Sequence, residues 1–302
     1  MKILLYLLRF ILGGIFIFSA LTKLFPIEVF ELNFVYQGIT GWEGAPYLSR
    51  ALIIIELFLG IALFFRYRQK EFILPATFFL LIAFSVYLIY SIAKDGNAGN
   101  CACFGTVLPM TPLESLIKNV LLLLIVVFLY VKTETKISSM KWLHPSIFVM
   151  VSAAIVLLFP IYDYSFEESS TKNEQADVVS LSGFKGDEKV DLSKGKKLVA
   201  IFNMACDHCI EVALKLSAVK SRVELPPSYY VLLGDSSEVK EFYSLTNSNA
   251  PYVLMQTSDF IKQFKSGWPR VFLLQDGRIK YDNNRRTFNG GDFEKAALEF
   301  LN

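Results

Sequence analysis

The chain has 302 residues, of which 53% are hydrophobic and 27 are phenylalanine. This length accommodates about two domains, and the composition indicates that lipid surrounds at least part of the chain. The formal net charge is only +2, and the sequence contains no long basic run. A balance of this kind does not support nucleic-acid binding, so we expect membrane lipid as a partner and no nucleic acid.

Five apolar segments are long enough to cross a bilayer, which takes about 20 residues, or fewer where flanking side chains snorkel. They are Ile3–Leu24, Leu48–Phe65, Phe72–Ala93, Leu113–Val131 and Ile147–Ile161. The first resembles a signal peptide in its position. Its apolar run is too long for one, however, and Lys23 stands where a small-residue cleavage site is needed. We therefore expect five membrane spans.

The connections between these spans carry unequal positive charge. The richer connections follow the second and the fourth span and contain Arg66, Arg68, Lys70, Lys132, Lys136 and Lys141. The positive-inside rule then predicts a cytoplasmic N-terminus. Five spans place Cys101, Cys103 and everything after Tyr162 on the outer side. We expect a multi-pass protein of the bacterial inner (cytoplasmic) membrane, with a periplasmic or otherwise extracytoplasmic C-terminal domain.

The pattern along the chain predicts four regions. They are a four-helix membrane domain over residues 1–135, a fifth transmembrane helix over 136–164, a polar linker over 165–178 and a soluble α/β domain over 179–302. In the last region, buried strands are predicted for 196–202 and 229–234, and Asp276-Gly277 predicts a hairpin within 270–282. Helices are predicted for 209–223, 237–245 and 291–301. The fold class is a membrane α-helical bundle followed by a soluble α/β domain.

The soluble domain holds a C-x-x-C motif between a predicted strand and a predicted helix. Cys206 falls at the helix N-terminus, where free amide groups and the helix dipole favour a thiolate. We expect Cys206 to be the nucleophile and Cys209, one turn further on, to be the resolving thiol. A protonated His208 stabilises the Cys206 thiolate, whereas Asp207 opposes it, so these residues do not fix the sign of the redox potential.

Residues 179–302 resemble a thioredoxin-fold domain of the membrane-tethered, extracytoplasmic thiol–disulfide type. The resemblance rests on the lead-in and active-site loop "LSKGKKLVAIFNMACDHC" and on "GWPRVFLL". It implies a cis-proline at Pro269, preceded by Trp268, opposite the cysteines. The sequence departs from the family at Met204-Ala205, where an aromatic residue usually precedes the motif.

The other two cysteines, Cys101 and Cys103, form a C-A-C motif after the third span. A disulfide across one residue closes a tight ring, which is expected to be strained and easily reduced. Such a pair suits electron transfer better than it suits a static link. A structural disulfide is the alternative, because extracytoplasmic cysteines oxidise readily.

The segment "CACFG" resembles the MauE branch of the DoxX-like membrane proteins, as do "LRFILGGIFIFSALTKL", "IIELFLGIAL" and "SLIKNVLLLL". The resemblance covers most of residues 1–130. It implies a role of the kind linked to disulfide formation in methylamine dehydrogenase. The four-helix arrangement is also similar to that of vitamin K epoxide reductase, which passes electrons to a quinone. This chain lacks a C-x-x-C motif within a span, so no cofactor is certain and a membrane quinone is one candidate.

Charged residues within the spans are the remaining candidates for function. Glu56 lies in the middle of the second span, and an ionisable group there usually faces a partner or a cavity. Lys118 lies at a comparable depth in the fourth span, and Arg9 is the other candidate partner. A buried pair that fixes helix packing and a catalytic proton relay are both open for Glu56. We expect Lys23 and Arg50 to snorkel at the outer ends.

Together these features predict a membrane thiol–disulfide oxidoreductase that acts on extracytoplasmic thiol or disulfide proteins. In this interpretation electrons pass between Cys206–Cys209 and Cys101–Cys103, in either direction. No second C-x-x-C and no H-x-x-x-H motif is present, so we expect no metal site of the zinc type. Two alternatives are a Cu(I)-handling protein with soft thiolate ligands, and a scaffold whose tethered domain docks partners.

Overall fold

The computed structural model describes residues 2–65, 68–97, 103–105, 108, 110–134, 142–161, 177–263, 267–283 and 288–301. Cys101 and most of the expected linker lie outside these residues. The chain divides into two compact units. The first unit comprises Met1–Phe34 and Glu43–Tyr162, and the second comprises Val35–Trp42 and Asp163–Asn302.

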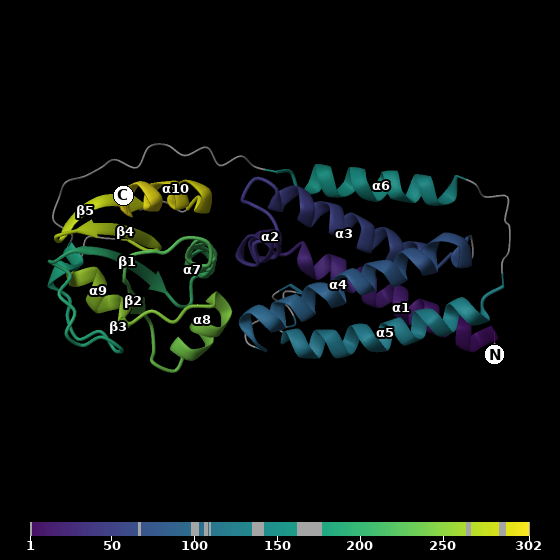
Figure 1. Cartoon of the computed structure of the whole chain (residues 1–302), viewed down its shortest axis with the longest axis horizontal. Helices are drawn as coiled ribbons and strands as arrows, with labels where there is room; N and C mark the ends of the chain where they lie inside the picture. Colours follow the sequence, from purple (N-terminus) through teal and green to yellow (C-terminus); the bar gives the residue numbers. More distant parts are fainter. Residues whose placement is uncertain are drawn as a thin grey trace. The chain divides into compact units, whose positions relative to one another are not determined.

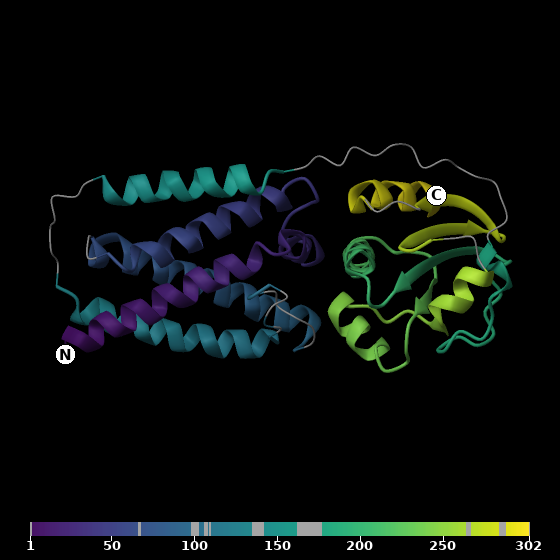
Figure 2. The same cartoon turned by 180° about the vertical axis from the view of Figure 1, so that it is seen from behind.

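The first unit is helical (Figures 1 and 2). Its elements are α1 (Lys2–Lys23), α2 (Ile27–Tyr36, which continues into the second unit), α3 (Ala45–Ala62), the π-helical turn η1 (Gln69–Ile73), α4 (Leu74–Asp95), α5 (Pro112–Lys132) and α6 (Leu143–Leu158). Helix α3 packs against α1 on one side and α6 on another, and α4 packs against α5. A membrane α-helical bundle is thereby confirmed.

Four of these helices are long and apolar enough to cross a membrane, namely Ile3–Lys23, Ala45–Ala62, Gln69–Asp95 and Pro112–Lys132. The protein is therefore a multi-pass membrane protein. Helix α6 is apolar as well but has only 16 residues, and a helix of that length measures about 24 Å. Helix α2 was not expected from the sequence, because Glu28 and Glu31 interrupt its apolar pattern.

Helices α1 and α3 touch through glycines. A Cβ atom on Gly13 would lie 2.8 Å from the carbonyl oxygen of Gly60, and a Cβ atom on Gly60 would lie 3.1 Å from that of Gly13. Gly14, the next residue, has open space where its Cβ would be. Small residues at such positions let two membrane helices approach to backbone contact. This close approach brings the end of α1 beside the middle of α3.

The second unit is built on a five-stranded sheet of order β3-β2-β1-β4-β5. Its elements are η2 (Asp177–Ser180), β1 (Lys196–Asn203), α7 (Asp207–Lys220), β2 (Ser228–Leu233), α8 (Val239–Thr246), β3 (Tyr252–Met255), α9 (Thr257–Gln263), β4 (Arg270–Gln275), β5 (Arg278–Asn283) and α10 (Gly290–Leu301). Strands β1, β2 and β3 run parallel, whereas β4 is antiparallel to β1 and to β5. This is the thioredoxin-like α/β domain expected from the sequence.

Side chains of β1 alternate between two cores, as the period of a strand requires. Leu198, Ala200 and Phe202 pack with α7, α8 and α10 on one face of the sheet. Val199 and Ile201 pack on the other face with Phe260 of α9 and with the segment that precedes β1. A strand buried on both faces is rigid, so its end is a fixed starting point for the loop that carries Cys206.

The hairpin between β4 and β5 turns at Asp276 and Gly277, whose φ angles are +52° and +75°. Two successive residues in the left-handed region form the tight turn that Asp-Gly favours, and the predicted hairpin is thereby confirmed. Strand β3 and helix α9 were not expected, because each is short. Residues 252–255 are only half-buried, so they show neither strict alternation nor a continuous buried run.

Candidate functional site

Cys206 stands at the end of the loop that leaves the central strand β1. It is the N-terminal cap residue of α7, with extended backbone angles of φ −104° and ψ 117°. Its carbonyl oxygen accepts the amide hydrogens of Cys209 and Ile210, which closes the first helical turn. The thiol is half-buried and in the free state. Cys206 is thus accessible at a helix N-terminus, the place where a thiolate is stabilised.

Cys209 lies one turn further along and is fully buried. Its Sγ accepts a hydrogen bond from the backbone amide of Asn203, with an N–S distance of 3.3 Å. Burial raises the pKa of the Cys209 thiol, and the neighbouring Cys206 raises it further, while the Asn203 amide lowers it in part. Cys209 is therefore held as a neutral thiol until its neighbour has reacted.

His208 points away from the protein core and is mostly exposed. Its Nδ1 atom lies 3.8 Å from Oε2 of Glu211, and Oε1 of Glu211 accepts a hydrogen bond from Nζ of Lys215. Lys215 also donates to the carbonyl oxygen of Phe288. Glu211 was not singled out from the sequence, although its spacing to Lys215 is that of a helical ion pair.

Trp268 and Pro269 precede β4, and the peptide bond between them is cis, as the family resemblance implied. Strand β4 is antiparallel to β1, with Arg270 opposite Ile201. The residues just before β4 therefore lie at the edge of the sheet from which the Cys206 loop emerges. Trp268 packs edge-to-face against Phe260, with 6.1 Å between the ring centroids. The fold thus brings Trp268 and Pro269 to the same edge as the two cysteines.

The second cysteine motif reaches the described part of the structure at Cys103, which is half-buried. Cys103, Phe104 and Gly105 form a turn, which we call the cysteine turn. The Phe104 ring packs against Phe18 of α1, with centroids 5.6 Å apart, and Nζ of Lys118 lies 4.1 Å from the Phe104 centroid. The sequence-predicted Lys118 therefore lies beside the turn.

Two further contacts hold the cysteine turn to α1. The Ser19 hydroxyl donates to the carbonyl oxygen of Cys103 over 3.0 Å. Gly105 has φ +58°, and a Cβ atom there would lie 2.1 Å from the carbonyl oxygen of Thr22. Only glycine fits this position, because the backbones are in contact and the angle is left-handed. This requirement accounts for the glycine at the end of "CACFG".

The partner of Glu56 is Lys23, so the expectation of Lys118 or Arg9 is wrong. Lys23 Nζ and Glu56 Oε2 are 2.7 Å apart, and their side chains are only 3% and 5% exposed. Arg9 instead donates to the carbonyl oxygens of Leu63 and Phe65. Lys23 does not snorkel, because the approach of α1 to α3 places its ammonium against the carboxylate.

Arg50 does not snorkel either. Its guanidinium pairs with Glu31 over 2.5 Å and donates to the carbonyl oxygens of Phe159 and Pro160. The side chains of Arg50 and Glu31 are 10% and 17% exposed. The first unit thus contains a second ion pair, which is partly buried and joins α2 and α3 to the end of α6.

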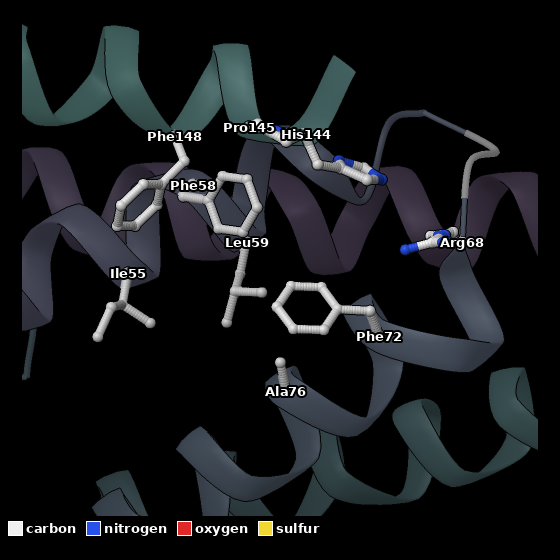
Figure 3. A pocket seen from close by; sticks show the side chains of 9 residues that line it. All are labelled: Ile55, Phe58, Leu59, Arg68, Phe72, Ala76, His144, Pro145 and Phe148. Carbon is white, nitrogen blue, oxygen red and sulfur yellow. The ribbon is translucent and has the colours of Figure 1, made fainter. Parts of the chain in front are cut away.

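A cavity of about 470 Å³ lies between α3, α4 and α6. Its lining residues are Ile55, Phe58, Leu59, Arg68, Phe72, Ala76, His144, Pro145 and Phe148, as Figure 3 shows. The lining is mainly apolar, with the polar groups of Arg68 and His144 at one side. None of these nine residues belongs to α1 or α5, whose contacts with the cysteine turn are described above.

Within the residues that the structure describes, no group of three or more His, Cys, Asp or Glu side chains could hold a metal ion. Cys206 and Cys209 supply two thiols, one half-buried and one fully buried. The chemistry available at the cysteine turn is that of a thiol beside the cation of Lys118.

Two comparisons concern the whole chain and its N-terminal part. A family model described as methylamine utilisation protein MauE matches residues 1–132. Protein TlpB of Flavobacterium psychrophilum is 26% identical over an alignment of 345 residues, which covers 96% of this chain and 94% of that protein.

Two solved structures similar to part of this chain are described as thiol–disulfide proteins. The thioredoxin domain of a thiol-disulfide oxidoreductase from Bacteroides vulgatus is 17% identical, with a TM-score of 0.35, and covers 45% of this chain and 100% of that one. A secreted disulfide oxidoreductase of Mycobacterium tuberculosis is 13% identical, with a TM-score of 0.31, and covers 35% of this chain and 81% of that one.

Proposed function

We propose that this protein, whose residues 1–132 match the MauE family and whose C-terminal domain has a thioredoxin-like fold, is a membrane-bound thiol–disulfide oxidoreductase. One observation carries the proposal. A half-buried Cys206 thiol stands at the N-terminus of α7, and a fully buried Cys209 thiol lies one turn behind it. The first thiol has the access that an attacking sulfur needs, and the second is shielded from every partner except the first.

Each step of the exchange forms one sulfur–sulfur bond and breaks another. The Cys206 thiolate attacks a sulfur of a partner disulfide, forms a bond to it and releases the other partner sulfur as a thiolate. Cys209 then loses its proton to that thiolate or to solvent and attacks the Cys206 sulfur. The Cys206–Cys209 disulfide forms, and the partner leaves as a dithiol with two more electrons and two more protons. The same steps in reverse oxidise a dithiol partner.

The second part of the proposal assigns Cys101 and Cys103 as the pair that exchanges with Cys206 and Cys209. Loop charge predicts that both pairs face the same compartment, outside the cytoplasm. Cys103 is half-buried rather than fully buried, and a disulfide across one residue is expected to reduce easily. The proposed substrates are extracytoplasmic thiol or disulfide proteins, and the proposed location is the bacterial inner membrane with a cytoplasmic N-terminus.

A membrane quinone is the proposed terminus for electrons on the membrane side. The cavity between α3, α4 and α6 is not its reaction site in this proposal, because its lining includes no residue of α1 or α5, the helices that carry Ser19 and Lys118. In this proposal the quinone reaches Cys103 from the surrounding lipid. An external thiol is the other terminus consistent with the cysteine positions.

Thiol trapping in the full chain tests the proposal. We expect a protein that keeps only Cys103 and Cys206, or only Cys101 and Cys206, to form an internal disulfide under mild oxidation. A protein that keeps only Cys103 and Cys209 is the matched control, and we expect no link because Cys209 is buried. Absence of both Cys206 links across a range of redox buffers would overturn the relay.

The oxidoreductase assignment itself has a separate test. The purified full chain should reduce or oxidise a model disulfide substrate, and a Cys206→Ser variant should not. Tightly bound copper without any disulfide exchange would favour the Cu(I)-handling alternative instead. Full function in living cells after substitution of both Cys206 and Cys209 by alanine would favour the scaffold alternative.

A further inference from the structure

A buried ammonium group lies one side chain away from the cysteine turn. Nζ of Lys23 is 2.7 Å from Oε2 of Glu56 and 2.7 Å from Oγ of Ser19. Ser19 in turn contacts the carbonyl oxygen of Cys103 over 3.0 Å. An unbroken series of short polar contacts therefore runs from α3 through the end of α1 to the backbone of Cys103.

The direction of each hydrogen bond in this series is fixed by chemistry. An ammonium group only donates, so Ser19 Oγ must be the acceptor of the bond from Lys23. The single hydroxyl hydrogen of Ser19 is then left to donate, and the carbonyl oxygen of Cys103 can only accept. Lys23 thus orients the Ser19 hydroxyl toward the turn. Polarisation by the ammonium also strengthens the bond that the hydroxyl donates.

Burial of the Lys23–Glu56 ion pair has a cost in free energy, which a role at the cysteine turn would explain. Removing two charges from water is costly in free energy, and apolar residues of similar volume often serve stability as well. Here the rings of Phe30 and Phe84 also face the ammonium, with centroids 5.5 and 5.4 Å from Lys23 Nζ. Of the two charged side chains, Lys23 contacts Ser19 directly and Glu56 contacts Lys23, so the ammonium is one step closer to the cysteine turn than the carboxylate.

We propose that Ser19 and Lys23 are positioning residues for thiol chemistry at Cys103, with Glu56 as the counter-ion that holds Lys23 in place. The inference rests on the proposed redox role of the Cys101–Cys103 pair. The Ser19 hydrogen bond fixes the Cys103 carbonyl group and withdraws electron density from it. Among the described residues, charged side chains with a contact to the turn or to its supports come from three helices: Lys23 of α1, Glu56 of α3 and Lys118 of α5.

This arrangement favours the Cys103 thiolate over the thiol. A fixed carbonyl group whose lone pairs are engaged repels a neighbouring negative charge less than a free one does. Stabilising a thiolate stabilises the reduced form of a cysteine pair and makes its disulfide more oxidising. Loss of the Ser19 hydroxyl should therefore slow alkylation of Cys103 near neutral pH and make the Cys101–Cys103 pair more reducing.

The test measures the pH profile of Cys103 alkylation in the full chain, in a background where Cys101, Cys206 and Cys209 are serine. We expect Ser19→Ala to slow alkylation at pH 7 by about two- to tenfold, the range for one hydrogen bond, and to move the profile to higher pH. Ser19→Thr keeps the hydroxyl and should restore most of the rate. Ser85→Ala is the matched control, because the Ser85 hydroxyl is buried but bonds within α4 to Leu81.

A second set of variants addresses the charges. Glu56→Gln should shift the Cys103 profile, whereas Glu31→Gln, which removes the counter-ion of the other ion pair, should not. If Glu56→Gln fails to fold, the double variant Lys23→Met with Glu56→Met removes both charges together, and it should reproduce the slower Cys103 alkylation of Ser19→Ala. Identical pH profiles for Ser19→Ala and Ser85→Ala would overturn the proposal.

The result of the alkylation test for Ser19 and Lys23 can be distinguished from the result of the cross-linking test for the proposed function. Alkylation of Cys103 reports its own reactivity and needs neither a partner protein nor Cys206. A shifted profile together with no Cys206 link would keep the positioning role and remove the relay. An unshifted profile together with an efficient Cys206 link would keep the relay and remove the positioning role.

Discussion

The backbone amide of Asn203 donates a hydrogen bond to Sγ of Cys209, and this bond ties the buried thiol to the end of the central strand. The strand lies between two hydrophobic cores, so the bond has a rigid donor. Cys209 therefore keeps its place while Cys206, three residues earlier at the helix start, exchanges partners. A fixed second sulfur is the structural requirement for rapid release of a mixed disulfide.

Substitution of the buried cysteine should trap partners. In Cys209→Ser, Cys206 still attacks a partner disulfide, but no second sulfur can release the product, so mixed disulfides should accumulate. Non-reducing gel electrophoresis and mass spectrometry of the purified variant would identify them. Cys206→Ser, which keeps the buried thiol, is the control. Adducts of equal abundance on Cys206→Ser would show that the order of the two roles is wrong.

The two thiols of the C-x-x-C motif should differ in their response to pH. An ordinary thiol is half ionised at its pKa of 9.0, but burial raises the pKa of Cys209 well above that value. Between pH 7 and 9, Cys209 should therefore stay protonated in the folded protein and resist iodoacetamide. Cys206 should be alkylated first over the whole range. Mass spectrometry of the quenched, reduced full chain would assign each site.

The same shift predicts a loss of stability in alkali. Above pH 9 the Cys209 thiol ionises in the unfolded chain but stays protonated in the folded one, so the unfolded state binds fewer protons. The free energy of unfolding of the reduced protein should then fall by up to about 1.4 kcal/mol per pH unit. Chemical unfolding of the full chain between pH 8.5 and 10, compared with Cys209→Ala, would isolate this contribution. Parallel pH dependences in the two proteins would contradict it.

Gly105 should tolerate no side chain. In Gly105→Ala the new Cβ would meet the carbonyl oxygen of Thr22 at 2.1 Å and would also require a left-handed backbone. Gly96 has φ +74° and ψ −166° but open space around its Cβ position, so Gly96→Ala should cost only the backbone strain, about 1–3 kcal/mol. We expect a larger loss of thermal stability for Gly105→Ala, accompanied by faster labelling of Cys103 with maleimide. Equal melting temperatures for the two variants would show that the turn is not in contact with α1.

The adjacent glycines of α1 should respond in opposite ways to alanine. In Gly13→Ala the Cβ would lie 2.8 Å from the carbonyl oxygen of Gly60, so α1 and α3 would have to separate. Gly14 has open space, and alanine favours a helix over glycine by about 1 kcal/mol. We expect Gly14→Ala to raise the melting temperature of the full chain or leave it unchanged, and Gly13→Ala to lower it. The reverse order would contradict the packing of α1 on α3.

The parts of the fold that could be predicted are those specified by residues that are close together in the sequence. Strand β1, the C-x-x-C motif and helix α7 follow one another without interruption, and each has a clear pattern. The Asp276-Gly277 turn is specified by two adjacent residues. Strand β3 has four half-buried residues, and its place in the sheet is decided by pairing with β2 rather than by its own sequence.

The pairing of Lys23 with Glu56 could not be predicted for a different reason. The two residues are 33 positions apart, and their contact depends on the rotation and separation of two helices. Depth in the membrane suggested Lys118 as a partner, but depth does not distinguish one side of a bundle from another. The glycines at positions 13 and 60 were a usable signal, because small residues on two spans indicate which helices touch.

The hold of α1 on the cysteine turn, through Ser19 at Cys103 and Thr22 at Gly105, has a kinetic consequence. Because the backbone of Cys103 is fixed against α1, the Cys206 sulfur has to diffuse to Cys103 before the two can react. If residues 165–178 act as the tether between the two domains, their length sets the effective concentration of Cys206 around Cys103. Evolution or an engineer could then tune the turnover of such a relay by adding or removing tether residues, without altering either pair of thiols.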